Sequence, residues 1–168
     1  MDNSLDNNIN PTNKIKLFYS SNKLKIIFIF ISLFLLLISI IVFNVLKEKK
    51  NNSIAEKYVQ AGLYLSSGEK NKAKNFYEEI INSKNKVYSI LALNLIIEKN
   101  LVDEKKLILN YFQKLEKINY TKDKSDLIKL KKALYLIKTG EKNIGETILK
   151  NLVKEKSILG KISQQILE

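Results

Sequence analysis

The chain has 168 residues and a formal net charge of +12 at pH 7, and it contains neither cysteine nor histidine. Arginine is also missing, so all 29 basic residues are lysine. This composition excludes thiol nucleophiles, a histidine general base and the usual Cys/His metal sites. We therefore expect that the chain is not an enzyme and that it binds no metal and no cofactor.

The first strong feature along the chain is an apolar run from Ile26 to Leu46 that contains no charged residue. At ~1.5 Å per residue a helix over this run reaches about 32 Å, enough for the ~30 Å hydrocarbon core of a bilayer. A cleavable signal peptide has a shorter apolar region and a small-x-small site, whereas this run leads directly into Lys47. The sequence therefore predicts an uncleaved transmembrane helix over residues 25–47, preceded by a disordered Asn- and Lys-rich tail over residues 1–24.

Lysines flank the predicted span on both sides. Lys14, Lys16, Lys23 and Lys25 precede it, and Lys47, Lys49, Lys50 and Lys57 follow it. The excess of cytoplasmic lysine that usually orients a helix is thus nearly balanced. Because long domains cross a membrane largely regardless of charge, the large C-terminal part favours a cytoplasmic N-terminus. In a Gram-negative cell this orientation places the C-terminal domain in the periplasm.

Residues 51–168 show the three- and four-residue spacing of apolar side chains that is typical of amphipathic helices. It is clearest in Leu107, Ile108, Tyr111, Phe112, Leu115 and Ile118, and in Ile144, Ile148, Leu149 and Leu152. Turn-forming stretches such as SSGEKN and KTGEKN divide the domain into six or seven helices of about 10 to 16 residues. The sequence predicts an all-α domain.

Small residues recur in this domain at one spacing, seven and then five positions apart. The spacing is found in Ala61, Gly68 and Ala73 and again in Ala133, Gly140 and Gly145. A weaker copy begins at Ala92, with Lys99 at the turn position and Glu104 at the second small position. The pattern resembles the tetratricopeptide repeat, a helix–turn–helix unit of ~34 residues. We therefore expect an all-α fold in which one N-terminal transmembrane helix is followed by a tetratricopeptide-like domain of helical hairpins, an α-solenoid. In this domain the small residues should lie where the paired helices cross.

Two other features predict which ligands the chain does not bind. Residues 140–147, GEKNIGET, match the start of a phosphate-binding loop, but Glu146 stands where that loop requires lysine. The lysines are interleaved with 17 acidic residues, and no arginine is present for bidentate base contacts. We expect no small-molecule substrate and no nucleic acid, and we assign the positive charge to solubility and attraction to anionic lipid.

The order of segments adds a family-level indication. A short lysine-bearing tail, one uncleaved span and irregular helical pairs beginning AEKYVQAGLYLSSGEKNKAKNFYEEI resemble the YfgM-like family, ancillary subunits of the bacterial SecYEG translocon. The closing SILGKISQQILE is similar to the terminal helix of that family, although the middle repeat lacks the turn glycine and the second small residue. The resemblance implies a single-pass inner-membrane protein whose periplasmic domain helps to pass exported proteins from the Sec translocon to periplasmic chaperones.

Two further functions stay open beside this one. An envelope assembly or cell-division adaptor has the same anchor and repeats and differs in its partner. A cytoplasm-facing membrane scaffold follows if the balanced lysines orient the span the other way. Periodicity and spacing alone indicate a membrane-anchored helical scaffold that binds proteins.

In tetratricopeptide pairs the first helix lines an inner groove, so alignment on the small residues gives candidate protein-binding positions. They are Tyr58, Gly62 and Leu65 from the first pair, Ser89, Leu93 and Ile97 from the second, and Leu134 and Lys138 from the third. Most are apolar, which fits either a groove for an apolar segment of a partner or a face covered by the terminal helix through Ile158, Ile162 and Ile166. The small size of the domain favours the covered face.

Overall fold

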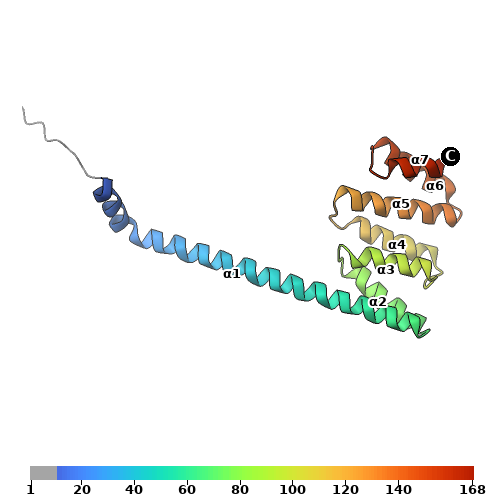
Figure 1. The fold of residues 1–168 in the computed structure, drawn as a ribbon, viewed down its shortest axis with the longest axis horizontal. Coiled ribbons are helices and arrows are strands. Elements are labelled where there is room, and N and C mark those ends of the chain that lie inside the picture. The colour runs from blue at the N-terminus through green and yellow to red at the C-terminus, as the bar shows by residue number, and fades with distance from the viewer. Residues whose placement is uncertain (1–10) are drawn as a thin grey trace, which may run out of the picture. The chain divides into compact units, whose positions relative to one another are not determined.

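A computed structural model describes residues 11–168, with side chains from residue 15 onward, and every regular element in this range is an α-helix. The chain divides into two units, residues 1–49 and residues 50–168. The helices are α1 (Pro11–Ser66), α2 (Lys70–Asn82), α3 (Tyr88–Glu98), α4 (Lys105–Glu116), α5 (Lys122–Lys138), α6 (Lys142–Lys154) and α7 (Gly160–Leu167) (Figure 1). The predicted all-α class is confirmed.

The first unit consists of the N-terminal part of α1. Among the described residues, α1 is the one helix that is long and apolar enough to cross a membrane by length and composition. Its most apolar window has a mean hydropathy of 3.4, and none of that window is buried inside the structure. The hydroxyl of Ser39 within the run donates to the carbonyl oxygen of Leu35 at 2.9 Å. The helix therefore satisfies this polar group internally, as an apolar surrounding requires.

The predicted tail over residues 1–24 differs in part from the structure. Residues 11–24 are helical and continue into the apolar run. Pro11 stands at the first helical position, where its missing N–H group costs no hydrogen bond. Residues 1–10 lie outside the described residues.

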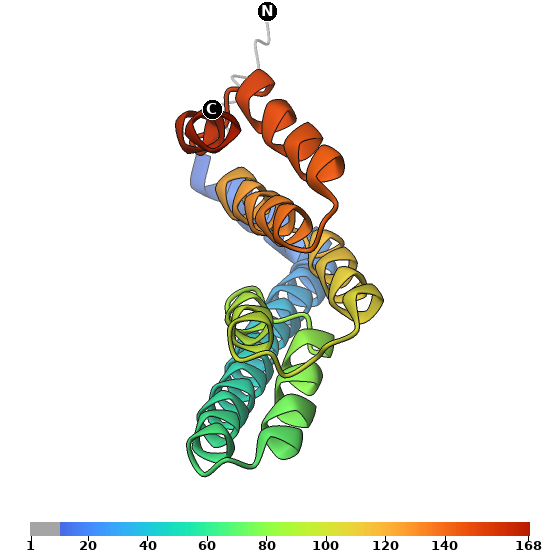
Figure 2. The same cartoon turned by 90° about the vertical axis from the view of Figure 1, so that its right-hand side faces the viewer.

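Residues 50–168 form two layers of helices (Figure 2). One layer contains the end of α1 with α3, α5 and α7, and the other contains α2, α4 and α6. Consecutive helices from α2 to α7 contact one another, and α2 also contacts α4. Across that last contact the hydroxyl of Tyr111 donates to Glu78 Oε1 at 2.6 Å. Short amphipathic helices are stable only through such neighbours, because each buries its apolar face against another helix.

Four connections contain the same left-handed turn. Three of them follow α1, α3 and α5, with the left-handed residues Gly68 (φ 80°), Asn100 (φ 48°) and Gly140 (φ 90°). The fourth follows α6 at Lys156 (φ 50°), where the N–H group of Ser157 donates to Leu152 O at 3.1 Å. In the turns after α1, α3 and α5, the N–H group of the residue that follows the left-handed residue donates a hydrogen bond to the carbonyl oxygen five residues earlier. These bonds join Glu69 to Tyr64 O at 2.8 Å, Leu101 to Ile96 O at 2.9 Å and Glu141 to Leu136 O at 2.8 Å. This is the Schellman hydrogen-bond pattern. The predicted glycine turns are confirmed, whereas the left-handed residue of the middle pair is Asn100 and not Lys99, because asparagine tolerates this conformation better than lysine.

This one-residue difference changes the equivalences within the middle pair. Seven residues before its left-handed residue stands Leu93, where the other two pairs have alanine. The second small residue of the other pairs is the fourth residue of α2 and α6, and the fourth residue of α4 is Ile108. Glu104, which the sequence spacing placed there, is instead the N-cap residue of α4. The middle pair thus carries large side chains at both positions.

The small residues of the first and third pairs lie at helix crossings. Ala61 and Ala73 have no exposed surface, and aromatic pairs across α1 and α2 flank them on both sides. These pairs are Tyr58 with Tyr77, at 5.9 Å between ring centroids, and Tyr64 with Phe76, at 5.4 Å. In the third pair a Cβ atom on Gly145 would lie 2.7 Å from the carbonyl oxygen of Ala133 and 2.6 Å from Ile137 Cγ1. Only glycine fits at this crossing.

The buried side chains form two hydrophobic clusters. The first contains 15 buried residues from α1 to α5, among them Tyr77 and Phe112. The second is smaller and contains Leu130, Ala133, Leu149 and Leu152 of α5 and α6. We call them the first core and the second core. The core of residues 50–168 is therefore divided into a large cluster and a small one.

The terminal helix differs from the prediction that its isoleucines cover the inner face. The exposed fractions are 74% for Ile158, 46% for Ile162 and 38% for Ile166. The buried residues of α7 are instead Gly160 and Ser163. A Cβ atom on Gly160 would lie 3.4 Å from the carbonyl oxygen of Leu152, so α7 approaches α6 through its small residues. The covered-face prediction is wrong for this reason.

Candidate protein-binding groove

A groove of about 370 Å³ lies between α3 and α5. Its lining residues are Asn94, Ile97 and Glu98 from α3 and Lys131, Leu134, Tyr135 and Lys138 from α5. Three of the candidate binding residues derived from the sequence, Ile97, Leu134 and Lys138, therefore meet in one place. We call this site the α3–α5 groove.

The same turn geometry places both sides of the groove. Asn94 and Glu98 stand six and two residues before the left-handed residue that ends α3. Leu134 and Lys138 stand six and two residues before the left-handed residue that ends α5. Residues four apart share one face of a helix, so equivalent faces of the two helices form the groove.

Tyr135 links the groove to the first core. Its ring lies 5.9 Å from the ring of Phe112 in α4. Burial raises the pKa of Tyr135, although the charge of Lys105 lowers it. The phenol is therefore neutral at physiological pH and able to donate a hydrogen bond. Lys105 is itself held by Thr139 O at 3.2 Å and Glu141 Oε1 at 2.9 Å, beside the end of α5.

The polar side chains of the groove differ between its two sides. The α5 side carries Lys131 and Lys138, and among the described residues neither of them forms an ion pair. The α3 side carries Asn94 and Glu98, whose carboxylate pairs with Lys99 at 2.7 Å. The site combines apolar contact area with two available cations. Its chemistry suits binding and offers no nucleophile paired with a base.

The remaining predicted site residues lie elsewhere. Tyr58 and Leu65 are partly buried against the first core. Ser89 is fully buried, and its hydroxyl donates to the carbonyl oxygen of Ile80 at 2.9 Å. Leu93 is also buried, at 2% exposure. Of the two alternatives for these positions, a groove or a covered face, Ser89 and Leu93 are covered, by their own core and not by the terminal helix, because the turn at Asn100 rotates the helix by one residue relative to the sequence alignment.

Four lining residues were missed by the sequence alignment. They are Asn94, Glu98, Lys131 and Tyr135. Counting back from Asn100 identifies the two α3 residues, so the signal that finds them is the asparagine in the turn. Gly62 is the equivalent of Leu134 in α1, and a Cβ atom there would meet nothing within 4 Å.

Exposed large apolar side chains of residues 50–168 gather on the layer that contains the groove. Eight of nine lie in, or within two residues of, α1, α3, α5 or α7: Val59, Leu63, Val87, Leu91, Leu134, Ile158, Ile162 and Ile166. The ninth is Ile144 of α6. The exposed large apolar side chains of this unit are therefore concentrated on one of its two layers.

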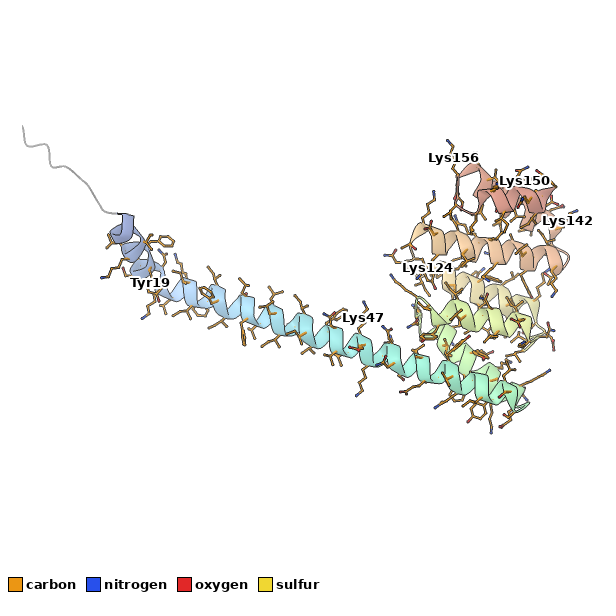
Figure 3. The ribbon with its side chains drawn as sticks, in the orientation of Figure 1. Tyr19, Lys47, Lys124, Lys142, Lys150 and Lys156 are labelled. Carbon is orange, nitrogen blue, oxygen red and sulfur yellow. The ribbon has the colours of Figure 1, made fainter. Side chains whose placement is uncertain are left out.

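The layer of α2, α4 and α6 has a different surface. Figure 3 shows Lys142 and Lys150 projecting from α6. Both pair with Glu146 of the same helix, at 3.6 Å and 3.8 Å. Such exposed pairs one helical turn apart are typical of a solvated helix face.

The described residues contain no metal-binding cluster, and the hollow lined by α4 is not a second groove of this kind. Within the described residues, no group of three acidic, histidine or cysteine side chains lies close enough to hold a metal ion. A hollow of about 520 Å³ lies along α4, but its lining comes from that single helix between Glu104 and Gln113. No protein-family model, curated protein or solved structure matches this chain. The α3–α5 groove differs from the hollow along α4 because two helices line it from opposite sides.

Proposed function

We propose that the protein is a membrane-anchored scaffold that binds a protein partner in the α3–α5 groove. The observation that carries this proposal is the groove itself. Equivalent faces of α3 and α5 meet there around Leu134, and the α5 side also carries the cations of Lys131 and Lys138. The groove lies on the layer where most of the exposed large apolar side chains are found. Apolar patches of this kind, rimmed by polar residues, are typical of protein-binding surfaces.

We infer that residues 50–168 are a tetratricopeptide-like α-solenoid. The repeated Schellman turns and the two helix layers support this assignment. In such a fold the first helix of each pair faces the binding side, and each added pair extends the surface. An apolar segment of a partner fits this arrangement, because the neighbouring first helices α3 and α5 form a groove between them.

We also propose that α1 spans the inner membrane of a bacterium, with the N-terminus in the cytoplasm and residues 50–168 in the periplasm. The uncharged run of α1 supports the span, and the size of the C-terminal domain supports the orientation. A reporter fused after Glu168 that is active only in the periplasm tests this orientation. Activity of a cytoplasmic reporter at the same position contradicts it.

The partner that we propose is a Sec translocon subunit or a periplasmic chaperone. The resemblance of the chain to the YfgM-like family supports this choice, and the groove supplies a surface for it. In this role the protein helps to hand exported chains from the translocon to chaperones.

Site-specific photo-crosslinking in intact membranes tests the proposed function. A photoreactive residue at Leu134 should capture the partner, since this side chain lies in the groove. The matched control is Ile144, which is also exposed and apolar but lies on the other layer. Adducts specific to Leu134 that contain a translocon subunit or chaperone support the proposal. Equal adducts at both positions, or adducts at Ile144 alone, contradict it.

A further inference from the structure

Successive helices of residues 50–168 run in opposite directions, so their connections lie at two opposite ends of the unit (Figure 1). The chain enters this unit at Lys50. The connections α2–α3, α4–α5 and α6–α7 lie at that end, which we call the Lys50 end. The connections α1–α2, α3–α4 and α5–α6 lie at the other end, which we call the Gly68 end.

The Lys50 end is strongly basic. Counted from the last residue of one helix to the first of the next, its connections are residues 82–88, 116–122 and 154–160. Their charged residues are the lysines Lys84, Lys86, Lys117, Lys122, Lys154 and Lys156 and the acids Glu116 and Glu155. All six lysines are exposed, and among the described residues none of them forms an ion pair. Figure 3 shows Lys124, in the first turn of α5, at the same end as Lys156.

The two acids of the Lys50 end do not neutralise these lysines. Glu116 pairs with Lys132 at 2.9 Å, and Glu155 pairs with Lys129 at 3.2 Å. Both partners belong to the body of α5. Within the described residues no carboxylate pairs with any of the six connection lysines, although Lys122 donates to the backbone oxygen of Glu155 at 3.3 Å.

The Gly68 end has a balanced composition. Its connections, residues 66–70, 98–105 and 138–142, contain five lysines and five acids. Each of these three connections contains an acidic residue that forms an ion pair: Glu69 with Lys72, Glu98 with Lys99 and Glu141 with Lys105. Because the two ends belong to one chain with one overall amino-acid bias, that bias does not explain the difference between them.

The turn residues add an independent observation. At the Gly68 end the left-handed positions are taken by Gly68, Asn100 and Gly140, which tolerate this conformation. At the Lys50 end Lys84 (φ 58°) and Lys156 (φ 50°) occupy left-handed positions. A lysine there lowers the stability of the fold relative to glycine. The Lys50 end thus carries lysine at two turn positions where the Gly68 end carries glycine or asparagine.

We propose that the Lys50 end binds the anionic surface of the bilayer in which α1 is anchored, an inference that rests on the proposed membrane anchor. Lys50 follows the apolar run by four residues, a link of ~6 Å as helix and at most ~14 Å when extended. Basic segments this close to a membrane are attracted by anionic lipid headgroups within about one Debye length, ~8 Å at physiological salt. The six lysines act together with Lys47 and Lys49.

Fluorescence quenching of the labelled full chain in lipid vesicles tests this proposal. Since the chain has no cysteine, single labels are placed at Asn119→Cys, in the α4–α5 connection, and at Asn143→Cys, at the start of α6. A fluorophore on each cysteine is quenched by a quencher attached to lipid headgroups when it lies near the surface. In phosphatidylcholine vesicles containing phosphatidylglycerol we expect strong quenching at residue 119 and weak quenching at residue 143. In pure phosphatidylcholine, or at 1 M salt where the Debye length is ~3 Å, the quenching at residue 119 should fall.

Two charge-matched variants sharpen the test. The first changes Lys84, Lys86, Lys117 and Lys156 to Gln, at the Lys50 end. The second changes Lys70, Lys99, Lys106 and Lys142 to Gln, at the Gly68 end. Each lysine removed at the Lys50 end should lower the ratio of surface-bound to free domain about fivefold, which corresponds to ~1 kcal/mol. The control variant should leave this ratio unchanged.

The outcomes separate this inference from the proposals on which it rests. Flotation of the full chain with neutral vesicles reports the anchor alone, and crosslinking at Leu134 reports the protein partner alone. A chain that does not float overturns both the anchor and this inference. A chain that floats, but whose label at residue 119 is quenched equally on neutral and anionic vesicles, overturns the inference while the anchor stands. Equal effects of the two lysine variants also overturn it.

Discussion

The second and third helical pairs end their first helix with the same turn, yet they meet their partner helices differently. In the third pair, Ala133 and Gly145 lie so close that a Cβ atom on the glycine would collide with backbone. In the second pair the equivalent positions hold Leu93 and Ile108, and both are buried. The left-handed residue fixes which side chains face the partner helix. The size of those side chains then fixes how closely the two helices approach.

This difference also decides which side chains reach the surface. Leu93 is 2% exposed and belongs to the first core. Leu134, its counterpart in the spacing of the sequence, is 42% exposed and lines the α3–α5 groove. One residue of register thus separates a core position from an exposed position in the groove.

The largest expected effect is that of Leu93→Glu. The change places a carboxylate inside the first core, and a buried unpaired charge costs several kcal/mol. This cost approaches the ~5–15 kcal/mol stability of a whole domain. We expect loss of the cooperative melting transition in circular dichroism. Leu134→Glu is the control and should melt within ~0.5 kcal/mol of the unchanged protein. Normal melting of Leu93→Glu would place this side chain on the surface and refute the register.

Ile108→Ala should have the next largest effect. Ile108 is 1% exposed in the first core, and truncation leaves a cavity that typically costs ~2–5 kcal/mol. Urea unfolding measures this loss as a lower midpoint at unchanged slope. A loss below ~1 kcal/mol would show that the second pair does not need a large side chain there.

Gly145→Ala enlarges the side chain at the position that is equivalent to Ile108. The added methyl group collides with the carbonyl oxygen of Ala133, and overpacking of this kind costs ~1–3 kcal/mol. The matched control is Gly62→Ala, where the methyl group enters open space in a helix and should stabilise by ~0.5–1 kcal/mol. Stabilisation by both changes would contradict the close crossing. Ala73→Leu extends the test to the first pair, again with an expected loss of ~1–3 kcal/mol.

The turns themselves should give smaller effects. Gly140→Ala forces a Cβ atom into the left-handed region at φ 90°, at a cost of ~1–2 kcal/mol. Asn100→Gly keeps the left-handed conformation available and should change stability by less than ~1 kcal/mol. Thermal melting of the two variants compares them directly. Equal losses would show that Asn100 does more than allow the turn.

The smallest effect at neutral pH is that of Tyr111→Phe, which becomes visible in alkali. Burial, and then the hydrogen bond to Glu78, raise the pKa of Tyr111 well above its usual range. A group whose pKa is raised by folding contributes stability below its unfolded pKa of ~10 and loses it as pH rises further. Melting temperatures should therefore fall above pH ~10, and by less in Tyr111→Phe. A larger alkaline loss in the variant would contradict this sign.

The features of the fold that depend on local chemistry were predictable from the sequence. The uncharged run of α1 and the glycine turns at Gly68 and Gly140 follow from composition and spacing. The register of α3 does not, because Lys99 and Asn100 are neighbours and lysine also occupies left-handed positions in this chain, at Lys84 and Lys156.

The candidate site was predictable only in part for the same reason. Leu134 and Lys138 follow from a pair with an ideal glycine turn. The pair without one gives Ile97, which lines the groove, but also Ser89 and Leu93, which are buried. The terminal helix shows a further limit. The four-residue spacing of Ile158 and Ile162 predicts a buried face, but the close approach of Gly160 to α6 turns that face outward. Tertiary packing decides which of two possible faces is covered.

The most direct test of the account is a joint measurement on Leu134→Glu in native membranes. Photo-crosslinking from the neighbouring groove residue Ile97 reports partner binding, and protease resistance of residues 50–168 on heating reports folding. We predict that Leu134→Glu abolishes the adduct at Ile97 while the domain resists protease to the same temperature as before. An unchanged adduct would contradict the groove as the binding site, and an unfolded domain would show that Leu134 belongs to the core.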